Sequence, residues 1–311
     1  MKCLITGACG FVGQYLAKEL VQKGADVVGL ERPAAARPGA CRVIDCDMLD
    51  FPRLLGAIAD LQPDQVFHLA GLTHPSESLR IPRDYFLVNV QGTVNLLDAL
   101  RQARCEPRCL LVSSAEVYGC SVASGLIDET CTPAPSNPYG ASKLLAEMAG
   151  LSYWRDFRSR VIVARPFNHS GPGQNETFVV SDFCRQVVLL EGKPETMRTI
   201  YVGNLTSSRD FLDVRDVVAA YAALAEKGVE GEIYNISSGQ AVTVQAILDT
   251  VLRLAKVEIR VEVSPEKYRP GTARPLVGSS QKLRALIGWQ PRYPLEQTIA
   301  DTLEHWRAKL T

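Results

Sequence analysis

The amino-acid sequence predicts an α/β protein, built as a doubly wound parallel sheet of the Rossmann type with a second, smaller α/β lobe. Two patterns predict this fold. Through the first half of the 311 residues, short apolar runs alternate with helical periodicity, which is typical of parallel strands joined by right-handed crossovers. After Arg165 the alternation loosens at the Gly171-Pro172-Gly173 break, where a separate lobe is expected to begin.

The predicted elements follow these patterns in chain order. In the first half, strands are expected at residues 3–6, 26–30, 65–69, 109–113 and 160–165, and helices at 12–23, 51–61, 85–104 and 138–157. In the second half, strands are expected at 199–202, 233–236 and 259–263, and helices at 179–191, 214–227, 244–256 and 294–309. We therefore expect a first domain over 1–165, to which residues of roughly 204–238 return, and a lobe made mainly of 166–311.

The composition excludes several classes of function. Lys and Arg together number 34, as do Asp and Glu, so the formal net charge is zero and no nucleic-acid surface is expected. Nine cysteines without a CxxC pair, with four scattered histidines, predict reduced thiols and no metal site. The chain enters a strand at once and lacks an apolar run of membrane-spanning length, which predicts a cytoplasmic protein without membrane contact.

A glycine-rich turn, Thr-Gly-Ala-Cys-Gly-Phe-Val-Gly over residues 6–13, follows the first predicted strand and opens the first helix. Gly7 permits a tight turn, Gly10 lets backbone approach a pyrophosphate, and Gly13 lets the helix pack on the strand. The first helical turn, with Phe11 and Val12, offers N–H groups and a partial positive charge to phosphate. The G-x-x-G-x-x-G spacing departs from the commoner G-x-G-x-x-G, but its context favours a dinucleotide cofactor.

The adenosine end of that cofactor is expected to meet Glu31, at the end of the second predicted strand and 24 residues beyond Gly7. A carboxylate there can accept both ribose hydroxyls. It also repels a 2′-phosphate, by about 4 kcal/mol at roughly 4 Å in a surface-like dielectric, which favours NAD(H). Arg32 next to it could hold that phosphate instead, which leaves NADP(H) as the alternative.

Two later strand ends complete the predicted cofactor site. Asp47, followed by Met48, could bond the adenine amine or serve as a helix cap or turn residue. The small residues of Leu69-Ala70-Gly71 would let a cofactor ribose pass close to the backbone. His68, just before them, is expected to be a core histidine with satisfied ring nitrogens.

An acid–base pair is expected at Tyr139 and Lys143, which lie four residues apart on one face of a predicted helix. A free phenol has a pKa of about 10, and a nearby ammonium, with the positive ring of an oxidised nicotinamide, favours the phenolate. Tyr139 can then exchange a proton with a substrate oxygen as hydride moves at carbon. Ser114 is a second hydroxyl for polarising a carbonyl, or otherwise a cap at a strand–loop junction.

Taken together and in chain order, these residues resemble the extended short-chain dehydrogenase/reductase family of nucleotide-sugar epimerases, dehydratases and reductases. The matching positions are residues 6–13, Glu31, Asp47, residues 68–71, Asn89 within residues 88–93, Ser114, Tyr139 and Lys143. The resemblance implies a nicotinamide-dependent enzyme in which Lys143 also holds the nicotinamide ribose.

The second lobe is similar to a narrower group in that family, the GDP-4-keto-6-deoxy-mannose reductases and the related GDP-mannose 4,6-dehydratases. The similar segments are residues 164–174, 178–183, 202–205, 209–218, 234–239 and 268–270. The likeness is closest to the reductases that form GDP-D-rhamnose. It also implies a homodimer formed through the helices over 85–104 and 138–157.

The resemblance also implies ligand-binding positions in the second half. Those for the substrate are Asn168, Val179, Lys193, Arg209 and Arg269, and the one for the cofactor is Pro166. Asn168 would lie near the substrate diphosphate, which Arg209 and Arg269 would clamp, as suits bidentate guanidinium–phosphate pairing. Without the resemblance, Arg209 would be expected to pair with Asp210 or Asp213.

Glu116 bears on the choice of reaction. Dehydratases need a base for the C5 proton and an acid for the leaving hydroxyl, and many carry an Asp-Glu pair where this chain has Ala115-Glu116. GDP-mannose dehydratases manage with the Glu alone. We therefore expect reduction of a 4-keto-6-deoxy sugar on a nucleoside diphosphate, GDP being favoured. The alternatives are a GDP-mannose 4,6-dehydratase, a 4-epimerase and a non-catalytic sensor, against which the complete Ser/Tyr/Lys set argues.

Overall fold

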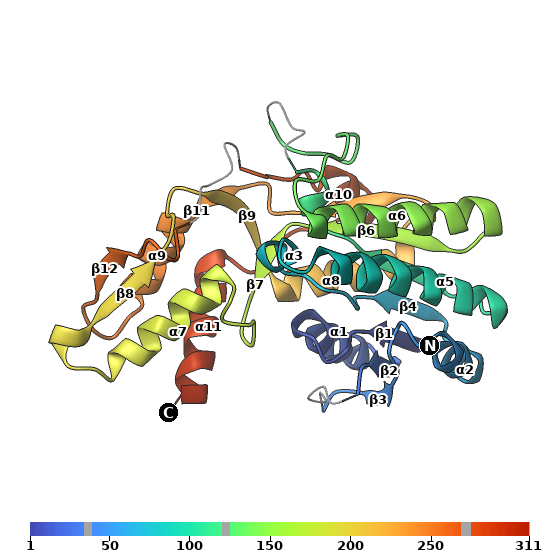
Figure 1. Ribbon diagram of the computed structural model, residues 1–311, viewed down its shortest axis with the longest axis horizontal. Coiled ribbons are helices and arrows are strands. Elements are labelled where there is room, and N and C mark those ends of the chain that lie inside the picture. Colours follow the sequence, from blue (N-terminus) through green and yellow to red (C-terminus); the bar gives the residue numbers. More distant parts are fainter. Residues whose placement is uncertain (34–38, 120–124, 269–274, 311) are drawn as a thin grey trace. The chain divides into compact units, whose positions relative to one another are not determined.

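The computed structural model describes residues 1–33, 39–119, 125–268 and 275–310. The chain forms two compact units, whose elements are labelled in Figure 1. The first unit comprises Met1–Pro166, Val217–Ile236 and Ser280–Trp289, and the second comprises Phe167–Asp216, Ser237–Ser279 and Gln290–Thr311. The chain therefore leaves the first unit after β6 and returns to it twice.

A seven-stranded sheet forms the centre of the first unit, and all of its strand pairs are parallel. Its strands are β1 (Lys2–Thr6), β2 (Asp26–Glu31), β3 (Arg42–Asp45), β4 (Gln65–His68), β5 (Arg108–Val112), β6 (Val161–Pro166) and β10 (Ile233–Ile236). The order β10-β6-β5-β4-β1-β2-β3 reverses direction between β1 and β4. The predicted doubly wound, Rossmann-type fold is confirmed.

Helices cover both faces of this sheet. They are α1 (Phe11–Gln22), α2 (Phe51–Leu61), α3 (Pro75–Ser78), α4 (Pro82–Tyr85), α5 (Gly92–Gln102), α6 (Pro138–Phe157), α8 (Val214–Lys227), α10 (Gln281–Ile287) and the short 3-10 helix η2 (Ala115–Val117). Leu54 of α2 and Leu96 of α5 share one buried cluster with Val163 of β6. The end of α8 packs on the opposite face, because Gly228 lies against Ile162, the neighbour of Val163.

One predicted helix is interrupted. The sequence predicts a single helix over residues 85–104, but the structure has α4, a π-helical segment η1 (Phe86–Gln91) and then α5. The Thr93 hydroxyl donates to the Asn89 carbonyl at 2.6 Å, and the Asn89 side chain bonds the Leu72 backbone. The Thr93 bond shares the Asn89 carbonyl with the helical ladder, which can loosen the ladder where the π-turn occurs.

The second unit has its own core and two small sheets. Its strands β11 (Ala241–Thr243), β9 (Ser208–Asp213) and β7 (Asn168–Ser170) form one sheet, and β12 (Arg260–Val263) pairs with β8 (Thr199–Val202) in the other. Its helices are α7 (Val179–Glu191), η3 (Glu195–Met197), α9 (Val244–Arg253) and α11 (Leu295–Leu310). Phe183, Leu248 and Trp306 belong to the buried cluster that joins α7, α9 and α11.

Residues 1–33, 39–119, 125–268 and 275–310 contain neither a membrane-spanning helix nor a metal-binding cluster. No helix in them is both long and apolar enough to cross a membrane. Nor do they contain a cluster of three or more His, Cys, Asp or Glu side chains that could hold a metal ion.

Candidate active site

The glycine-rich turn lies where the strand order reverses, between the ends of β1 and β4. Gly7 has a φ of +73°, and a Cβ there would lie 2.9 Å from the backbone nitrogen of Ala70. A Cβ on Gly13 would lie 2.3 Å from the carbonyl oxygen of Gly7. Gly10 is the N-cap of α1. Because it has no side chain, it leaves the backbone at the N-terminus of the helix, at Phe11 and Val12, uncovered. Side chains are thus excluded at Gly7 and Gly13, as close packing of a backbone cradle for a pyrophosphate requires.

Glu31 reaches back to this turn from the end of β2. Its carboxylate accepts the Cys9 N–H and the Arg32 N–H, each at 3.1 Å. The structure thus brings the predicted ribose-binding carboxylate beside the glycine cradle. Arg32 follows it with an exposed side chain.

Asp47 and Met48 occupy the loop between β3 and α2. Asp47 accepts the Leu49 N–H at 2.9 Å, which is a turn interaction, and Asp50 is the residue that caps α2. Met48 packs its side chain in the core, and its carbonyl accepts from Asn95 at 2.8 Å. The predicted contact between Met48 and the cofactor stays a prediction.

His68 is a satisfied core histidine, as predicted. Its ring nitrogens bond the hydroxyls of Thr6 at 2.7 Å and Thr93 at 2.9 Å. Burial lowers the pKa of His68 to about 3, so the imidazole is neutral at physiological pH. Thr6 also accepts the Ala70 N–H at 3.2 Å, which ties the end of β1 to the Leu69-Ala70-Gly71 segment.

The small residues after β4 allow a close approach from two other elements. A Cβ on Gly71 would lie 2.8 Å from Oδ1 of Asn89 and 3.6 Å from Nζ of Lys143. Asn89 also donates from Nδ2 to the hydroxyl of Ser142 at 2.9 Å. The π-turn therefore connects the β4 loop to α6, the helix that carries the predicted acid–base pair.

Tyr139 lies buried in the first turn of α6. The helix begins at Pro138 because Asn137 caps it, accepting the Gly140 N–H at 2.8 Å. Burial raises the pKa of Tyr139 to about 12, while a hydrogen bond with Ser114 acts in the opposite direction. From the sequence, a nearby ammonium is expected to favour the phenolate. In the structure desolvation is the larger effect, so the phenol is protonated at neutral pH.

Lys143 lies one helical turn after Tyr139 and is also buried. Its ammonium donates to the carbonyl of Val112 at 2.8 Å, at the end of β5. Burial lowers the pKa of Lys143 to about 8, and the charge of Glu147 opposes this effect. The lysine is therefore anchored to the strand that leads directly into Ser113 and Ser114.

Ser114 and Glu116 lie at the short helix η2, next to the N-terminus of α6. Ser114 caps η2 by accepting the Glu116 N–H at 3.2 Å. Oε2 of Glu116 accepts from Asn137 at 2.9 Å, and its charge contributes to raising the pKa of Tyr139. The structure thus brings together Ser114, Glu116, Tyr139 and Lys143, the four residues predicted to be catalytic.

A buried ion pair behind this group was missed by the sequence argument. Arg165 and Glu147 lie 2.7 Å apart, with side chains that are only 3% and 2% exposed. Two signals were present in the sequence: Glu147 lies four residues after Lys143 on α6, and Arg165 interrupts an otherwise apolar strand. Pro166, predicted to bind cofactor, follows Arg165 as the buried last residue of β6.

In the second unit, Arg209 does not follow the salt-bridge expectation. Its guanidinium donates to the Ser208 carbonyl at 2.8 Å. Asp210 accepts N–H groups from Ser238 and two glycines, while Asp213 pairs with Arg215 at 2.7 Å. Both carboxylates that could have paired with Arg209 are therefore engaged by other groups.

The other predicted substrate residues are spread over this unit. Asn168 is exposed at the start of β7 and pairs with Phe211, two residues along β9 from Arg209. Val179 begins α7 and Lys193 follows its end, so about 20 Å of helix separates them. They cannot contact one small chemical group, although an extended ligand could span them. Arg269 lies outside the described residues.

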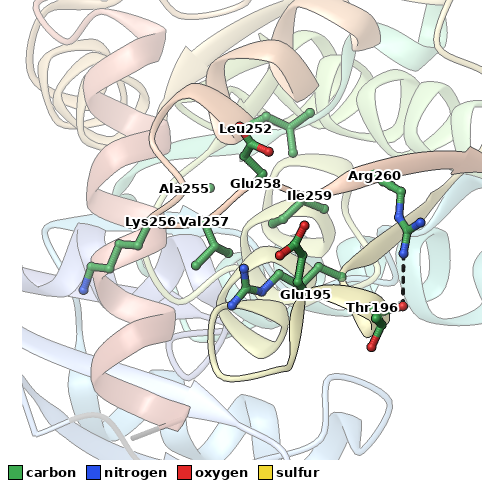
Figure 2. A pocket seen from close by; sticks show the side chains of 10 residues that line it. Glu195, Thr196, Leu252, Ala255, Lys256, Val257, Glu258, Ile259 and Arg260 are labelled. Atoms are coloured by element: carbon green, nitrogen blue, oxygen red, sulfur yellow. Dashed lines mark hydrogen bonds between the residues drawn. The ribbon is translucent and has the colours of Figure 1, made fainter.

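A cavity of about 1000 Å³ lies in the second unit, between η3 and the segment from α9 to β12 (Figure 2). The charged side chains that line it are Glu195, Arg198, Lys256, Glu258 and Arg260. Arg260 donates to the Thr196 carbonyl at 3.0 Å. None of the predicted site residues that the structure describes lines this cavity.

A Rossmann-type sheet with a tyrosine and a lysine one helical turn apart, next to its nucleotide cradle, defines a short-chain dehydrogenase/reductase, a class of NAD(P)-dependent oxidoreductases. The model of a family described as GDP-mannose 4,6 dehydratase matches residues 4–302. The chain belongs to this family.

Three similar proteins cover nearly the whole chain. A Pseudomonas aeruginosa protein named GDP-6-deoxy-D-mannose reductase is 36% identical over 310 residues, 99% of this chain and 98% of its own. The solved structure of RMD from Pseudomonas aeruginosa complexed with NADPH is 34% identical, with a TM-score of 0.84 and 99% of each chain covered. UDP-glucose 4-epimerase from Thermus thermophilus in complex with NAD is 30% identical, with a TM-score of 0.87 and the same coverage.

Proposed function

We propose that this protein reduces the C4 keto group of a nucleotide-linked 4-keto-6-deoxy sugar, GDP-4-keto-6-deoxy-D-mannose, to give GDP-D-rhamnose. The observation that carries the proposal is the buried Tyr139 phenol, hydrogen-bonded to Ser114 and one helical turn from Lys143. A protonated phenol in that position suits proton donation to a carbonyl oxygen. The full-length similarity to a GDP-6-deoxy-D-mannose reductase supports the choice of substrate.

The chain's own residues then act on the carbonyl oxygen. Reduced nicotinamide, when bound, supplies the hydride. Ser114 donates a hydrogen bond that orients the oxygen, and Tyr139 transfers its proton to the alkoxide as negative charge develops. Lys143 stabilises the resulting phenolate through its ammonium charge, which is strongest in a site from which water is excluded.

The cofactor is assigned to the cradle at the strand reversal. The residues proposed to hold it are Gly7, Gly10, Phe11, Val12, Gly13, Glu31, Arg32, Asp47, Met48, Leu69, Ala70, Gly71, Tyr139, Lys143 and Pro166. We propose NAD(H) as the preferred form because the Glu31 carboxylate faces the turn. The similar structure bound to NADPH keeps NADP(H) as the competing form.

Replacing Glu31 with alanine is expected to raise the ratio of kcat/KM with NADPH to that with NADH by about tenfold, which corresponds to about 1.4 kcal/mol. The reason is the loss of a carboxylate that repels a 2′-phosphate. Initial rates with each cofactor measure the ratio. The matched control is Glu226→Ala, at an exposed glutamate of α8, for which no change is expected. An unchanged ratio in Glu31→Ala would refute this account of cofactor choice.

The substrate is assigned to residues of the second unit. We propose that Arg209 and Arg269 hold the diphosphate, with Asn168 near it and Val179 and Lys193 at other parts of an extended nucleotide sugar. Arg209 and Asn168 lie on the paired strands β9 and β7, which supports assigning them to one ligand.

A homodimer formed through α5, η1 and α6 is also proposed. Exposed apolar side chains occur on η1 and on α6. They are Leu87 on η1 and Leu145, Met148 and Phe157 on α6. A second copy of the chain would cover them. The free thiols of the described cysteines are in keeping with a cytoplasmic location.

The test of the function is the absorbance of reduced nicotinamide in two parallel reactions. One contains GDP-4-keto-6-deoxy-D-mannose with NADH or NADPH, and the other contains GDP-mannose with the oxidised cofactor. We expect the absorbance to fall in the reaction that contains the keto sugar and to stay constant in the reaction that contains GDP-mannose. Absorbance that stays constant with the keto sugar would refute the proposal.

A 4,6-dehydratase is the second candidate, favoured by Glu116. This carboxylate lies close enough to Tyr139 to raise its pKa and is held in place by Asn137. It could remove a C5 proton from an oxidised sugar. Formation of a keto sugar from GDP-mannose in the second reaction would favour this candidate and give Glu116 the acid–base role.

A further inference from the structure

A network of buried polar groups lies directly behind the catalytic group, within the first unit. The Glu147 carboxylate on α6 accepts three hydrogen bonds. Two come from Nε and Nη2 of Arg165, at 3.0 Å and 2.7 Å, and the third comes from the hydroxyl of Ser113. Arg165 also donates to the Tyr118 hydroxyl at 2.9 Å, and that hydroxyl donates to Asn235 at 2.8 Å. All five residues are buried, so these contacts are shielded from water.

The network touches the proposed site at two points. Ser113 is the residue before Ser114, so the bond to Glu147 fixes the backbone from which the Ser114 hydroxyl projects. Glu147 also lies one helical turn after Lys143 on α6, on the same face. The carboxylate is therefore coupled to both sides of the catalytic group.

We propose that Glu147 is a positioning residue for the reaction, whose carboxylate, oriented by Arg165 and Ser113, keeps the Lys143 ammonium charged and anchored beside Ser114 and Tyr139. The proposal rests on the function given above, in which Lys143 acts as an ammonium. Glu147 touches neither substrate nor cofactor in this account and acts only through Lys143 and Ser113.

Charge balance supports this role. Lys143 is removed from water, and its ammonium donates to the Val112 carbonyl at 2.8 Å. A desolvated ammonium tends to lose its proton unless a negative charge compensates it. Glu147 supplies that charge, since it raises the pKa of Lys143 against the effect of burial. Arg165 orients the carboxylate through a planar pair of nitrogen donors.

Other groups around Lys143 and Glu147 do not replace this charge. Burial keeps His68 neutral and raises the pKa of Tyr85, Tyr118 and Tyr139, so these rings carry no charge near neutral pH. Glu116 is held by Asn137 next to Tyr139. Tyr221 of α8 also has a raised pKa, and Asp98 and Arg101 of α5 pair with each other. The helices α3 and α4, which also pack against α6, carry Glu77, Arg83 and Asp84, and all three are exposed to water.

The test compares Glu147→Gln, which keeps shape but removes charge, with Glu147→Asp, which keeps charge. In the wild type, kcat/KM is expected to fall as pH rises through about 8, because the ammonium is lost above the pKa of Lys143. In Glu147→Gln that fall is expected about one pH unit lower. In Glu147→Asp it is expected to stay near the wild-type position. Glu226→Gln, an exposed glutamate on α8, is the control.

A second readout does not depend on activity. In protein labelled with ¹³C-lysine and free of ligands, the Cε resonance of Lys143, assigned with Lys143→Met, reports its protonation directly. Its midpoint is expected to fall in Glu147→Gln in parallel with the kinetic profile. If the enzyme proves inactive on the keto sugar, the proposed function fails while this titration still tests the coupling.

Unchanged midpoints in a folded Glu147→Gln protein, by both readouts, would overturn the proposal. Should Glu147→Gln not fold, the double variant Glu147→Gln/Arg165→Met removes both buried charges and leaves neither unpaired. Its Lys143 midpoint is still expected to fall below that of the wild type. A midpoint equal to that of the wild type in the double variant would overturn the proposal as well.

Discussion

Replacing Tyr139 with phenylalanine is expected to lower kcat by about 10²- to 10⁴-fold, the usual contribution of a positioned general acid. The change removes the hydroxyl that donates the proton and keeps the buried ring. Because burial raises the pKa of Tyr139 to about 12, the phenol is the proton-carrying form across the neutral range. Initial rates at saturating keto sugar and cofactor measure the loss.

The control for this variant lies on the same helix. Tyr153→Phe removes a hydroxyl from a half-buried ring that packs against Phe157 at 5.1 Å, and its kcat is expected to equal that of the wild type. Thermal unfolding of both variants shows whether either is damaged in its fold. Near-wild-type turnover by a folded Tyr139→Phe protein would contradict the mechanism.

Replacing Arg165 with methionine is expected to lower the free energy of unfolding by about 3–5 kcal/mol, the usual cost of leaving one partner of a buried ion pair uncompensated. The change leaves the Glu147 carboxylate buried without its guanidinium. It also removes the donor to the Tyr118 hydroxyl and the guanidinium that lies 4.8 Å from the Tyr118 ring. Urea unfolding followed by tryptophan fluorescence measures the change.

The matched control is an exposed ion pair of similar length. Arg253 and Glu296 lie 2.8 Å apart with side chains that are 57% and 58% exposed, so Arg253→Met is expected to cause no measurable change. The double variant Glu147→Met/Arg165→Met is expected to recover much of the loss, because it removes both charges together. Equal losses at the buried and the exposed pair would show that burial is not the cause.

The helices α2 and α6 of the first unit were predictable because their packing leaves a periodic pattern of apolar residues. Residues 51–61 and 138–157 were predicted as helices and have those bounds in the structure. The strands β7 and β9 were not predicted, since Asn168–Ser170 and Ser208–Asp213 are short and mostly polar. Their stability comes from pairing with each other, which local periodicity does not report.

The π-turn η1 was not predictable for a related reason. It depends on the side chain of Asn89 reaching Leu72 and Ser142, which are 17 and 53 residues away in the chain. The intrinsic preferences of residues 85–104 favour one regular helix. Tertiary hydrogen bonds override those preferences here.

The proximity of Ser114, Tyr139 and Lys143 could be predicted from their spacing, but the electrostatics of this proposed catalytic group could not. Tyr139 and Lys143 share a helical face whatever surrounds them, and Ser114 follows an apolar run. The direction of the Tyr139 pKa depends on how deeply α6 is buried, which only the packed structure shows. Glu147 and Arg165 were overlooked because charged residues are read as exposed until a partner is seen.

The chain's return to its first unit has a consequence for synthesis on the ribosome. The strand β10 covers one edge of the seven-stranded sheet, but it is translated only after β6, α7 and β9 have emerged. A nascent chain that ends between these points presents β6 as an uncovered edge, whose free backbone groups invite pairing with other chains. Ile233 follows Pro166 by 67 positions, so at typical synthesis rates of about 5–20 residues per second that edge stays open for several seconds. The seven-stranded sheet is complete only once roughly three quarters of the chain has been synthesised. Stop codons before β10 are therefore expected to yield fragments that aggregate, and not a smaller nucleotide-binding unit that folds by itself.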